Sequence, residues 1–353
     1  MENEGLTARQ VFFMLTLFLT GNLVVNHGAK TLPTGWLAFL TLAAAAVPLL
    51  LLYASAAENC TAWEIFPAAF GKAAGGGMTA LYCAFALLLA GDAVRTFSDF
   101  IVINDLNNAG PIGNSAILLA VSVLLLLCSM ETIGKAAWLT QPLIALLMLV
   151  SLGLTISGAR LERALPLFAE GRERLLEGMT VSLARTLLPA VFPIFTIGGT
   201  VRGPWKKSAW RAGLVICLFL AVMSLRDTLV LGYPLMSVFR FPDYMGANTF
   251  HHSEVLVSTA FVLSQPFRVA LCLRYVQECL VHWRPQGRFW YPAALAAAAG
   301  GLSCMDLQAL PRSWRLPASG AAAAVLILPP LLALLLRRAK RRRALRQSAS
   351  IRD

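Results

Sequence analysis

The sequence is poor in charge: only 14% of its 353 residues are Asp, Glu, Lys or Arg, whereas 58% are apolar. Because a soluble domain averages about 25% charged residues, this composition excludes an ordinary soluble domain. The chain also lacks common enzyme motifs, with no P-loop, Rossmann glycine fingerprint, nucleophile elbow or HExxH sequence. We therefore expect a membrane protein that is not an enzyme and needs no cofactor.

The cysteine pattern gives no indication of disulfides or of a metal site. Most of the seven cysteines lie inside apolar runs, and none form a CxxC pair. They are typical of small core side chains, not of disulfides or metal ligands. No metal site is expected.

Apolar runs long enough to cross a bilayer account for most of the chain. A transmembrane helix needs about 20 largely apolar residues, because lipid cannot satisfy backbone hydrogen bonds. The sequence predicts an all-α integral membrane protein with about ten transmembrane helices in one domain over residues 1–336, followed by a basic tail at 337–353. The expected spans are 9–30, 35–57, 78–104, 115–130, 133–157, 181–201, 208–231, 253–278, 289–305 and 318–336.

Basic residues set the expected orientation. The net charge of +12 comes from loops and from the tail, a pattern typical of the positive-inside rule and of anionic lipid as a neighbour, not of nucleic acid. The tail is therefore predicted to be cytoplasmic, and ten spans bring the N-terminus to the same side. One segment conflicts with this topology. The expected outer segment 158–180 contains Arg160, Arg163, Arg172 and Arg174.

Two spans are interrupted by helix-breaking residues. Span 1 contains Thr20-Gly21-Asn22, and span 6 contains Pro189, Pro193 and Gly198-Gly199. These spans are corresponding members of two five-helix halves, and paired breaks at such positions indicate a 5+5 inverted-repeat transporter-like bundle with broken helices 1 and 6. The alternative is two ordinary kinks, because Gly and Pro are common in membrane helices.

A few charges lie inside the spans. Asp92, Arg95 and Asp99 share one face of span 3, because spacings of three and four residues align on a helix. We expect them to face the bundle interior, as an ion or proton relay or as a self-neutralising pair near the membrane edge. Arg226, Asp227 and Arg268 complete this predicted charge network; the adjacent Arg226 and Asp227 are expected to need partners on other helices.

Several short motifs carry a family resemblance over residues 6–280. They are Leu6-Thr7-Ala8-Arg9-Gln10, the break at Gly21, the run from Arg95 to Ile101, Phe192-Pro193-Ile194-Phe195, and Tyr233-Pro234. In this order and spacing, the sequence resembles the B subunit of spore germinant receptors, a branch of the amino acid/polyamine/organocation transporter superfamily.

The resemblance implies a multi-pass subunit in the inner membrane of a bacterial spore, with both an A subunit and a lipoprotein C subunit as partners. It would bind a small nutrient, typically an amino acid, and trigger germination. The family usually has a Gly-Glu pair after the span 6 break, where this chain has Thr196 and Ile197, so the nutrient is not identified. Two alternatives stay open: an ion-coupled amino-acid permease or symporter, and a scaffold subunit that binds no ligand.

The broken helices predict the ligand site. Free N–H groups at a half-helix N-terminus suit a carboxylate, and free carbonyls at a half-helix C-terminus suit an ammonium group. We expect the site between the two breaks, with Phe97 of span 3 as a wall. Its other residues are Gly21, Asn22, Phe195, Thr196, Gly198 and Gly199.

Overall fold

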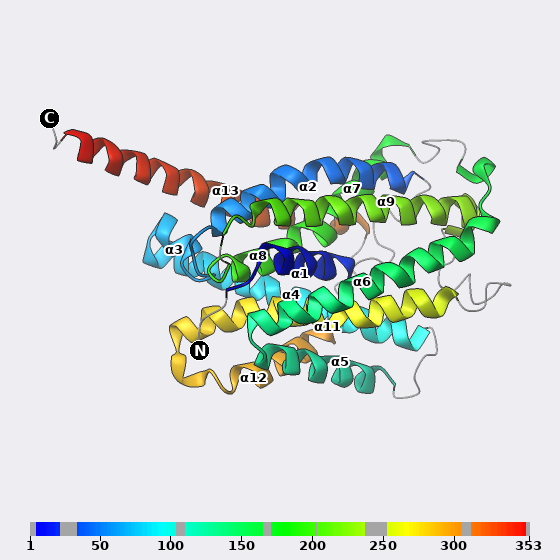
Figure 1. Cartoon of the computed structure of the whole chain (residues 1–353), viewed down its shortest axis with the longest axis horizontal. Helices are drawn as coiled ribbons and strands as arrows, with labels where there is room; N and C mark the ends of the chain where they lie inside the picture. Colours follow the sequence, from blue (N-terminus) through cyan, green and yellow to red (C-terminus); the bar gives the residue numbers. More distant parts are fainter. Residues whose placement is uncertain are drawn as a thin grey trace.

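The computed structural model describes residues 5–21, 34–103, 110–164, 171–201, 203–236, 253–304 and 312–350. Over these ranges the chain is a bundle of helices that run mainly along one direction (Figure 1). The longer helices are α1 (Ala8–Thr20), α2 (Gly35–Ala57), α4 (Lys72–Ile103), α5 (Gly110–Leu127), α6 (Met130–Thr155), α9 (Lys206–Met236), α11 (Ser253–Trp283), α12 (Tyr291–Ser303) and α13 (Arg312–Ser350).

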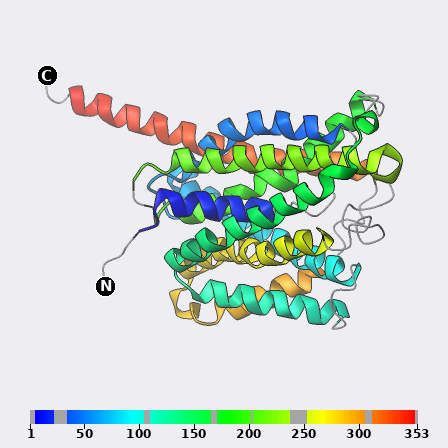
Figure 2. The same ribbon diagram turned by 45° about the vertical axis from the view of Figure 1, so that its right-hand side comes forward.

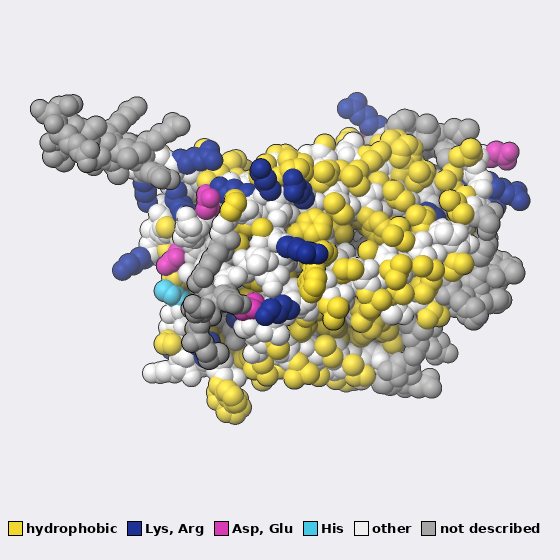
Figure 3. Space-filling view, in the orientation of Figure 1, with side chains coloured by type: hydrophobic (Ala, Val, Ile, Leu, Met, Phe, Trp, Pro, Cys, Tyr) yellow, Lys and Arg dark blue, Asp and Glu magenta, His cyan; other side chains and the backbone are white. Residues whose placement is uncertain are grey.

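Every predicted span corresponds to a helical segment. Eight segments of the described chain are long and apolar enough to cross a membrane. The helices of the other two spans, α1 and α12, have 13 residues each, or about 20 Å, against about 30 Å of hydrocarbon. Large apolar areas cover much of the face in Figure 3, and Lys and Arg gather toward the end from which α13 projects.

Helix α11 lies at the centre of the bundle. It contacts α1, α4, α5, α6 and α12, together with the short helix α8 (Val191–Ile197). Its residues from Val269 to Leu273 are all at most 1% exposed. Polar side chains on α11 are therefore well placed to act on several helices at once.

Helix α1 is fixed at its start and stops early. Thr7 and Gln10 form a reciprocal N-terminal cap, and the Leu6 N–H donates to the Thr200 carbonyl at 3.3 Å. The beginning of α1 therefore lies beside the end of span 6. The helix ends at Gly21, as expected from the predicted break of span 1. Asn22, the next residue of that break, lies outside the described residues.

The irregular part of span 6 lies at Pro189 and in the turn before it, not at Gly198-Gly199. After α7 (Arg172–Ser182) come a π-helical turn, η4 (Leu183–Leu187), and a 3₁₀ turn, η5 (Leu188–Ala190), before α8. The predicted break at Pro193–Gly199 instead covers the last turns of α8 and its C-terminal end. The reason is that a proline removes the hydrogen bond to the carbonyl four residues earlier and clashes with that turn. Pro189 and Pro193 thus disturb the chain before them.

The arginines that conflict with the predicted topology have a structural explanation in part. Helix α9 is kinked at Gly232, where φ is +73°. The carbonyls next to this kink accept from the backbone N–H of Arg160 (to Leu229, 3.0 Å) and from the guanidinium of Arg163 (to Val230). Arg160 directly precedes the short helix η3 (Leu161–Ala164), and Arg163 belongs to it. This segment therefore supplies hydrogen-bond donors to the carbonyls beside the kink of α9.

Side-chain to backbone hydrogen bonds hold helix α13 to the bundle. Pro329 and Pro330 leave the carbonyls of Val325 and Leu326 without their helical partners, and the buried Tyr82 hydroxyl donates to them at 2.8 and 3.3 Å. Further along, Arg337 donates to a carbonyl of α2, and Lys340 donates to carbonyls of the short helix α3 (Ile65–Phe70). The predicted domain boundary after residue 336 falls inside this continuous helix, which extends beyond the bundle (Figures 1 and 2).

Candidate functional site

The described end of α1 is bound by polar side chains of α11. The Gly21 carbonyl accepts from Gln265 Nε2 at 2.6 Å and from Arg268 at 3.5 Å. Gln265 and Arg268 are 0% and 4% exposed. A Cβ on residue 21 would lie 3.0 Å from Arg268 Cδ, so a larger residue here would require the Arg268 side chain to shift.

A second glutamine approaches the same end of α1 from α6. Gln141 Nε2 lies 3.4 Å from Thr20 Oγ1. The Thr20 hydroxyl donates its own hydrogen to the Thr16 carbonyl at 2.7 Å, so it must accept from Gln141. Two amide side chains from different helices thus bind consecutive residues of α1.

These contacts fix the orientation of both amides. A carbonyl only accepts, so the Gln265 atom beside Gly21 is its nitrogen, and the same logic holds for Gln141 at Thr20. The two side-chain oxygens, Gln141 Oε1 and Gln265 Oε1, are buried and have no donor among the residues that the structure describes. A buried acceptor without a donor costs about 1–3 kcal/mol. This arrangement therefore suits a ligand with N–H groups.

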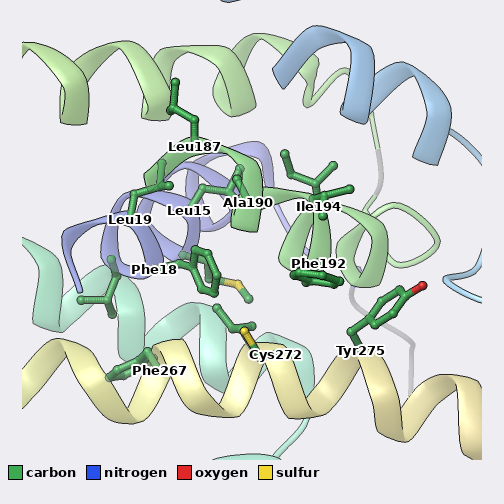
Figure 4. Close-up of a cluster of buried hydrophobic side chains, with 14 of the residues drawn as sticks. Leu15, Phe18, Leu19, Leu187, Ala190, Phe192, Ile194, Phe267, Cys272 and Tyr275 are labelled. Carbon is green, nitrogen blue, oxygen red and sulfur yellow. The ribbon is translucent and has the colours of Figure 1, made fainter. Parts of the chain in front are cut away.

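Span 6 packs beside α1 and runs antiparallel to it. In Figure 4, Leu15 lies near Ala190, and α1 contacts both η5 and α8. Because the two segments are antiparallel, continuing along α1 from Leu15 to Gly21 leads from η5 back toward the π-helical turn η4. Thr186 in that turn is a buried polar residue. The irregular part of span 6, and not its C-terminal end, is level with the end of α1.

The structure separates the predicted site residues of span 6 from Gly21. Because Thr200 binds Leu6 at the start of α1, Gly198 and Gly199 lie at the opposite end of that helix, about 20 Å from Gly21. A Cβ on Gly198 would lie 2.5 Å from the Ala57 carbonyl oxygen, so this glycine serves close packing against α2.

Phe195 and Thr196 are also core residues. The Phe195 side chain is fully buried in an aromatic cluster, and the Thr196 hydroxyl donates to the Phe192 carbonyl at 2.9 Å. The ring neighbours of Phe195 are Tyr53, Phe66, Tyr82 and Tyr275. Phe97 stacks on Phe261 of α11, with ring centroids 6.4 Å apart. None of these ring contacts joins Phe97 or Phe195 to the end of α1.

The span 3 charges have partners both on α11 and within α4. Asp92 interacts electrostatically with Arg268 across α4 and α11, which links part of the predicted network to the end of α1. Arg95 pairs with Asp99 at 3.5 Å, with side chains 25% and 49% exposed. Asp99 lies one turn from the end of α4 and is half-exposed, so this pair corresponds to the predicted alternative of a self-neutralising pair near the membrane edge.

The Arg226–Asp227 pair follows the expectation of partners on other helices only in part. These adjacent side chains bind each other, with Arg226 Nε and a terminal nitrogen 2.9 and 2.7 Å from Asp227 Oδ1. The arginine side chain is long enough to fold back along α9 to its neighbour. Arg226 also donates to Ser151 of α6 at 3.4 Å. Arg226 thus has a partner on another helix as well as its neighbour in the chain.

Interrupted helices packed around a central α11 define the class of protein: this is a transporter-type membrane bundle. The structure is similar to the crystal structure of MhsT in complex with L-phenylalanine, with a TM-score of 0.65 at 13% identity over 92% of this chain and 88% of that one. The predicted transporter-like fold is confirmed. Comparison with curated proteins finds no match.

A family model described as "Spore germination protein" matches residues 5–257, and the chain belongs to that family. The predicted resemblance is confirmed, and the protein is a germination-related, transporter-like protein that passes through the membrane several times. The matched region includes α1 and span 6 but ends before Gln265 and Arg268.

Gln141 and Gln265 were missed from the sequence as site residues. They are uncharged, so a search for intramembrane charge passes over them. One signal was available: each is a polar residue followed directly by a proline inside an apolar helix, as Gln141-Pro142 and Gln265-Pro266.

Proposed function

We propose that this protein is the nutrient-sensing subunit of a spore germinant receptor and that it binds an amino acid at the end of α1. Membership of the spore germination family supports the germination role. The transporter fold supports a small-molecule site, since the neighbour MhsT is described in complex with L-phenylalanine. The observation that carries the proposal is the pair of donor-less oxygens, Gln141 Oε1 and Gln265 Oε1, beside a stopped helix.

The chemistry of the site suits an α-ammonium group. The end of a helix carries partial negative charge from its unpaired carbonyls, and the two amide oxygens add acceptors next to it. An ammonium group has three donors, enough for both amide oxygens and one further carbonyl. We propose Gly21, Gln141, Gln265 and the η4 turn as the site, in place of the group around Phe195–Gly199.

The proposed setting follows the family. The subunit would work with an A subunit and a lipoprotein C subunit in the spore inner membrane. Both termini would be cytoplasmic, because Lys and Arg gather toward the end of the bundle from which α13 projects (Figure 3). The second candidate, an amino-acid permease, is favoured by the same fold similarity to MhsT.

Germination of spores carrying single substitutions tests the proposal. Gln265→Met and Gln141→Met remove an acceptor while keeping side-chain length, so the nutrient concentration for half-maximal germination should rise at least about tenfold for about 1.4 kcal/mol of lost binding. Gln277→Met is the matched control, because Gln277 lies on α11 about 18 Å further along and its Oε1 also has no donor among the described residues.

Unchanged sensitivity of both site variants at normal protein level would favour the scaffold function. Uptake of the nutrient by vesicles that contain the purified protein would favour the permease.

A further inference from the structure

A cationic side chain occupies the end of α1. The Arg268 guanidinium lies 3.5 Å from the Gly21 carbonyl oxygen, and its Cδ atom fills the space beside Gly21. The residue is 4% exposed and comes from α11, the central helix. This guanidinium is therefore part of the bundle interior at the break.

The position is one where a mobile cation could bind. The last carbonyls of a helix lack intrahelical partners and carry partial negative charge. In transporter folds with interrupted helices, such C-terminal ends and unwound carbonyls coordinate the coupling cation. A cation site of this kind needs the carbonyl to be accessible to an ion stripped of water.

In this protein the carbonyl is already covered. Gln265 Nε2 lies 2.6 Å from the Gly21 oxygen, and Arg268 brings a full positive charge to the same atom. Asp92 of α4 interacts electrostatically with Arg268, so a +1 and a −1 charge offset each other. A Na⁺ ion would have to displace both donors from the Gly21 oxygen, whereas an ammonium group bound to the Gln141 and Gln265 side-chain oxygens would leave them in place.

We propose that Arg268 is a resident cation that takes the place of an alkali cation at the end of α1, so that ligand binding by this protein requires no coupled Na⁺ or K⁺. The part that concerns ligand binding rests on the proposed function. The part that concerns the cation does not, because it is a property of the protein without ligand. The inference favours a sensor over a Na⁺-coupled symporter.

The first experiment measures thermal stability of the purified, ligand-free protein in NaCl, KCl or choline chloride at equal ionic strength. The wild-type Tm should be the same in all three salts. In Arg268→Gln the Gly21 carbonyl loses its cationic neighbour while Asp92 stays, so Na⁺ should bind and raise Tm by about 5 °C at 100-fold above its dissociation constant. Arg268→Lys keeps the charge and should behave as wild type.

Two results would overturn the proposal: saturable stabilisation of the wild type by Na⁺ or K⁺, or an Arg268→Gln protein that folds and gains no Na⁺ dependence. If Arg268→Gln does not fold, the wild-type and Arg268→Lys salt series still decide the question.

The second experiment adds the amino acid that triggers germination. Its affinity for the wild type should be unchanged, within twofold, when choline replaces Na⁺. In Arg268→Gln the affinity should fall in choline and recover in Na⁺. Loss of affinity in both salts would instead make Arg268 a direct partner of the ligand carboxylate and would contradict the proposal. Absence of binding by the wild type in either salt would refute the proposed function and leave the ligand-free salt series as the test of the cation.

Discussion

The hydroxyl of Tyr82 should stabilise the protein through the double-proline site of α13. Pro329 and Pro330 free the carbonyls of Val325 and Leu326, and one hydroxyl hydrogen serves both at 2.8 and 3.3 Å. Tyr82→Phe removes that hydrogen and leaves the ring in place. Because only one hydrogen is lost, the expected cost is about 1 kcal/mol, within the range for buried and intramembrane hydrogen bonds.

A double-mutant cycle separates this bond from general packing effects. In Pro329→Ala, the new N–H at position 329 supplies the Val325 carbonyl, so the Tyr82 hydroxyl becomes largely dispensable. Tyr82→Phe should then cost less than half as much as in the wild type, a coupling of about 0.5 kcal/mol or more. The assay is reversible unfolding of the purified protein in mixed detergent micelles.

Tyr291→Phe provides the matched control. Tyr291 donates to the Arg284 carbonyl at 2.7 Å in an exposed setting, where water replaces a lost partner, so its substitution should cost less than about 0.5 kcal/mol. Equal costs for Tyr82→Phe with and without Pro329 would refute the reasoning, because the hydroxyl would then not compensate for the proline.

Three further predictions follow from the packing. Gly198→Ala should destabilise by about 1–3 kcal/mol in the same unfolding assay, since its Cβ would lie 2.5 Å from the Ala57 carbonyl oxygen, whereas Gly153→Ala, with open space around it, should be neutral or slightly stabilising. Arg163→Leu should speed amide hydrogen exchange at the kink of α9, because a carbonyl there loses its guanidinium donor. The backbone N–H of Thr61 donates to the Glu64 carboxylate and lowers its pKa in the folded state. The ionised carboxylate therefore stabilises the fold above its ordinary pKa of 4.5, and this stabilisation is lost as the pH falls through the lowered pKa. Between pH 6 and pH 3, the Tm of Glu64→Gln should therefore fall less than the Tm of the wild type.

The sequence predicted the spans and the break in span 1 because both depend on local properties. Hydropathy over about 20 residues identifies a membrane helix whatever its neighbours are, and Gly21 marked the end of α1 correctly. In span 6 the predicted break was correct at Pro189 but extended too far, to Gly198-Gly199. A proline acts on the turn before it, so Pro189 and Pro193 indicate the η4 and η5 turns, not Gly198.

The composition of the site depends on tertiary contacts, which no local pattern specifies. Whether Gly198 packs against α2 or faces a ligand depends on how closely two helices approach. Likewise, Arg226 and Asp227 proved able to bind each other because of side-chain length, not helix position. Asp92 was identified from its charge, but its electrostatic neighbour Arg268 lies on a helix 176 positions later in the chain.

The most direct test of the central claim is calorimetric binding of amino acids to the purified protein and to its Gln265→Met and Gln277→Met variants. If the ligand binds at the end of α1, at least one amino acid will bind to the wild type and to Gln277→Met with the same affinity and at least about tenfold more weakly to Gln265→Met. Equal affinity of all three proteins would contradict the account, because the donor-less oxygen beside Gly21 would then take no part in binding.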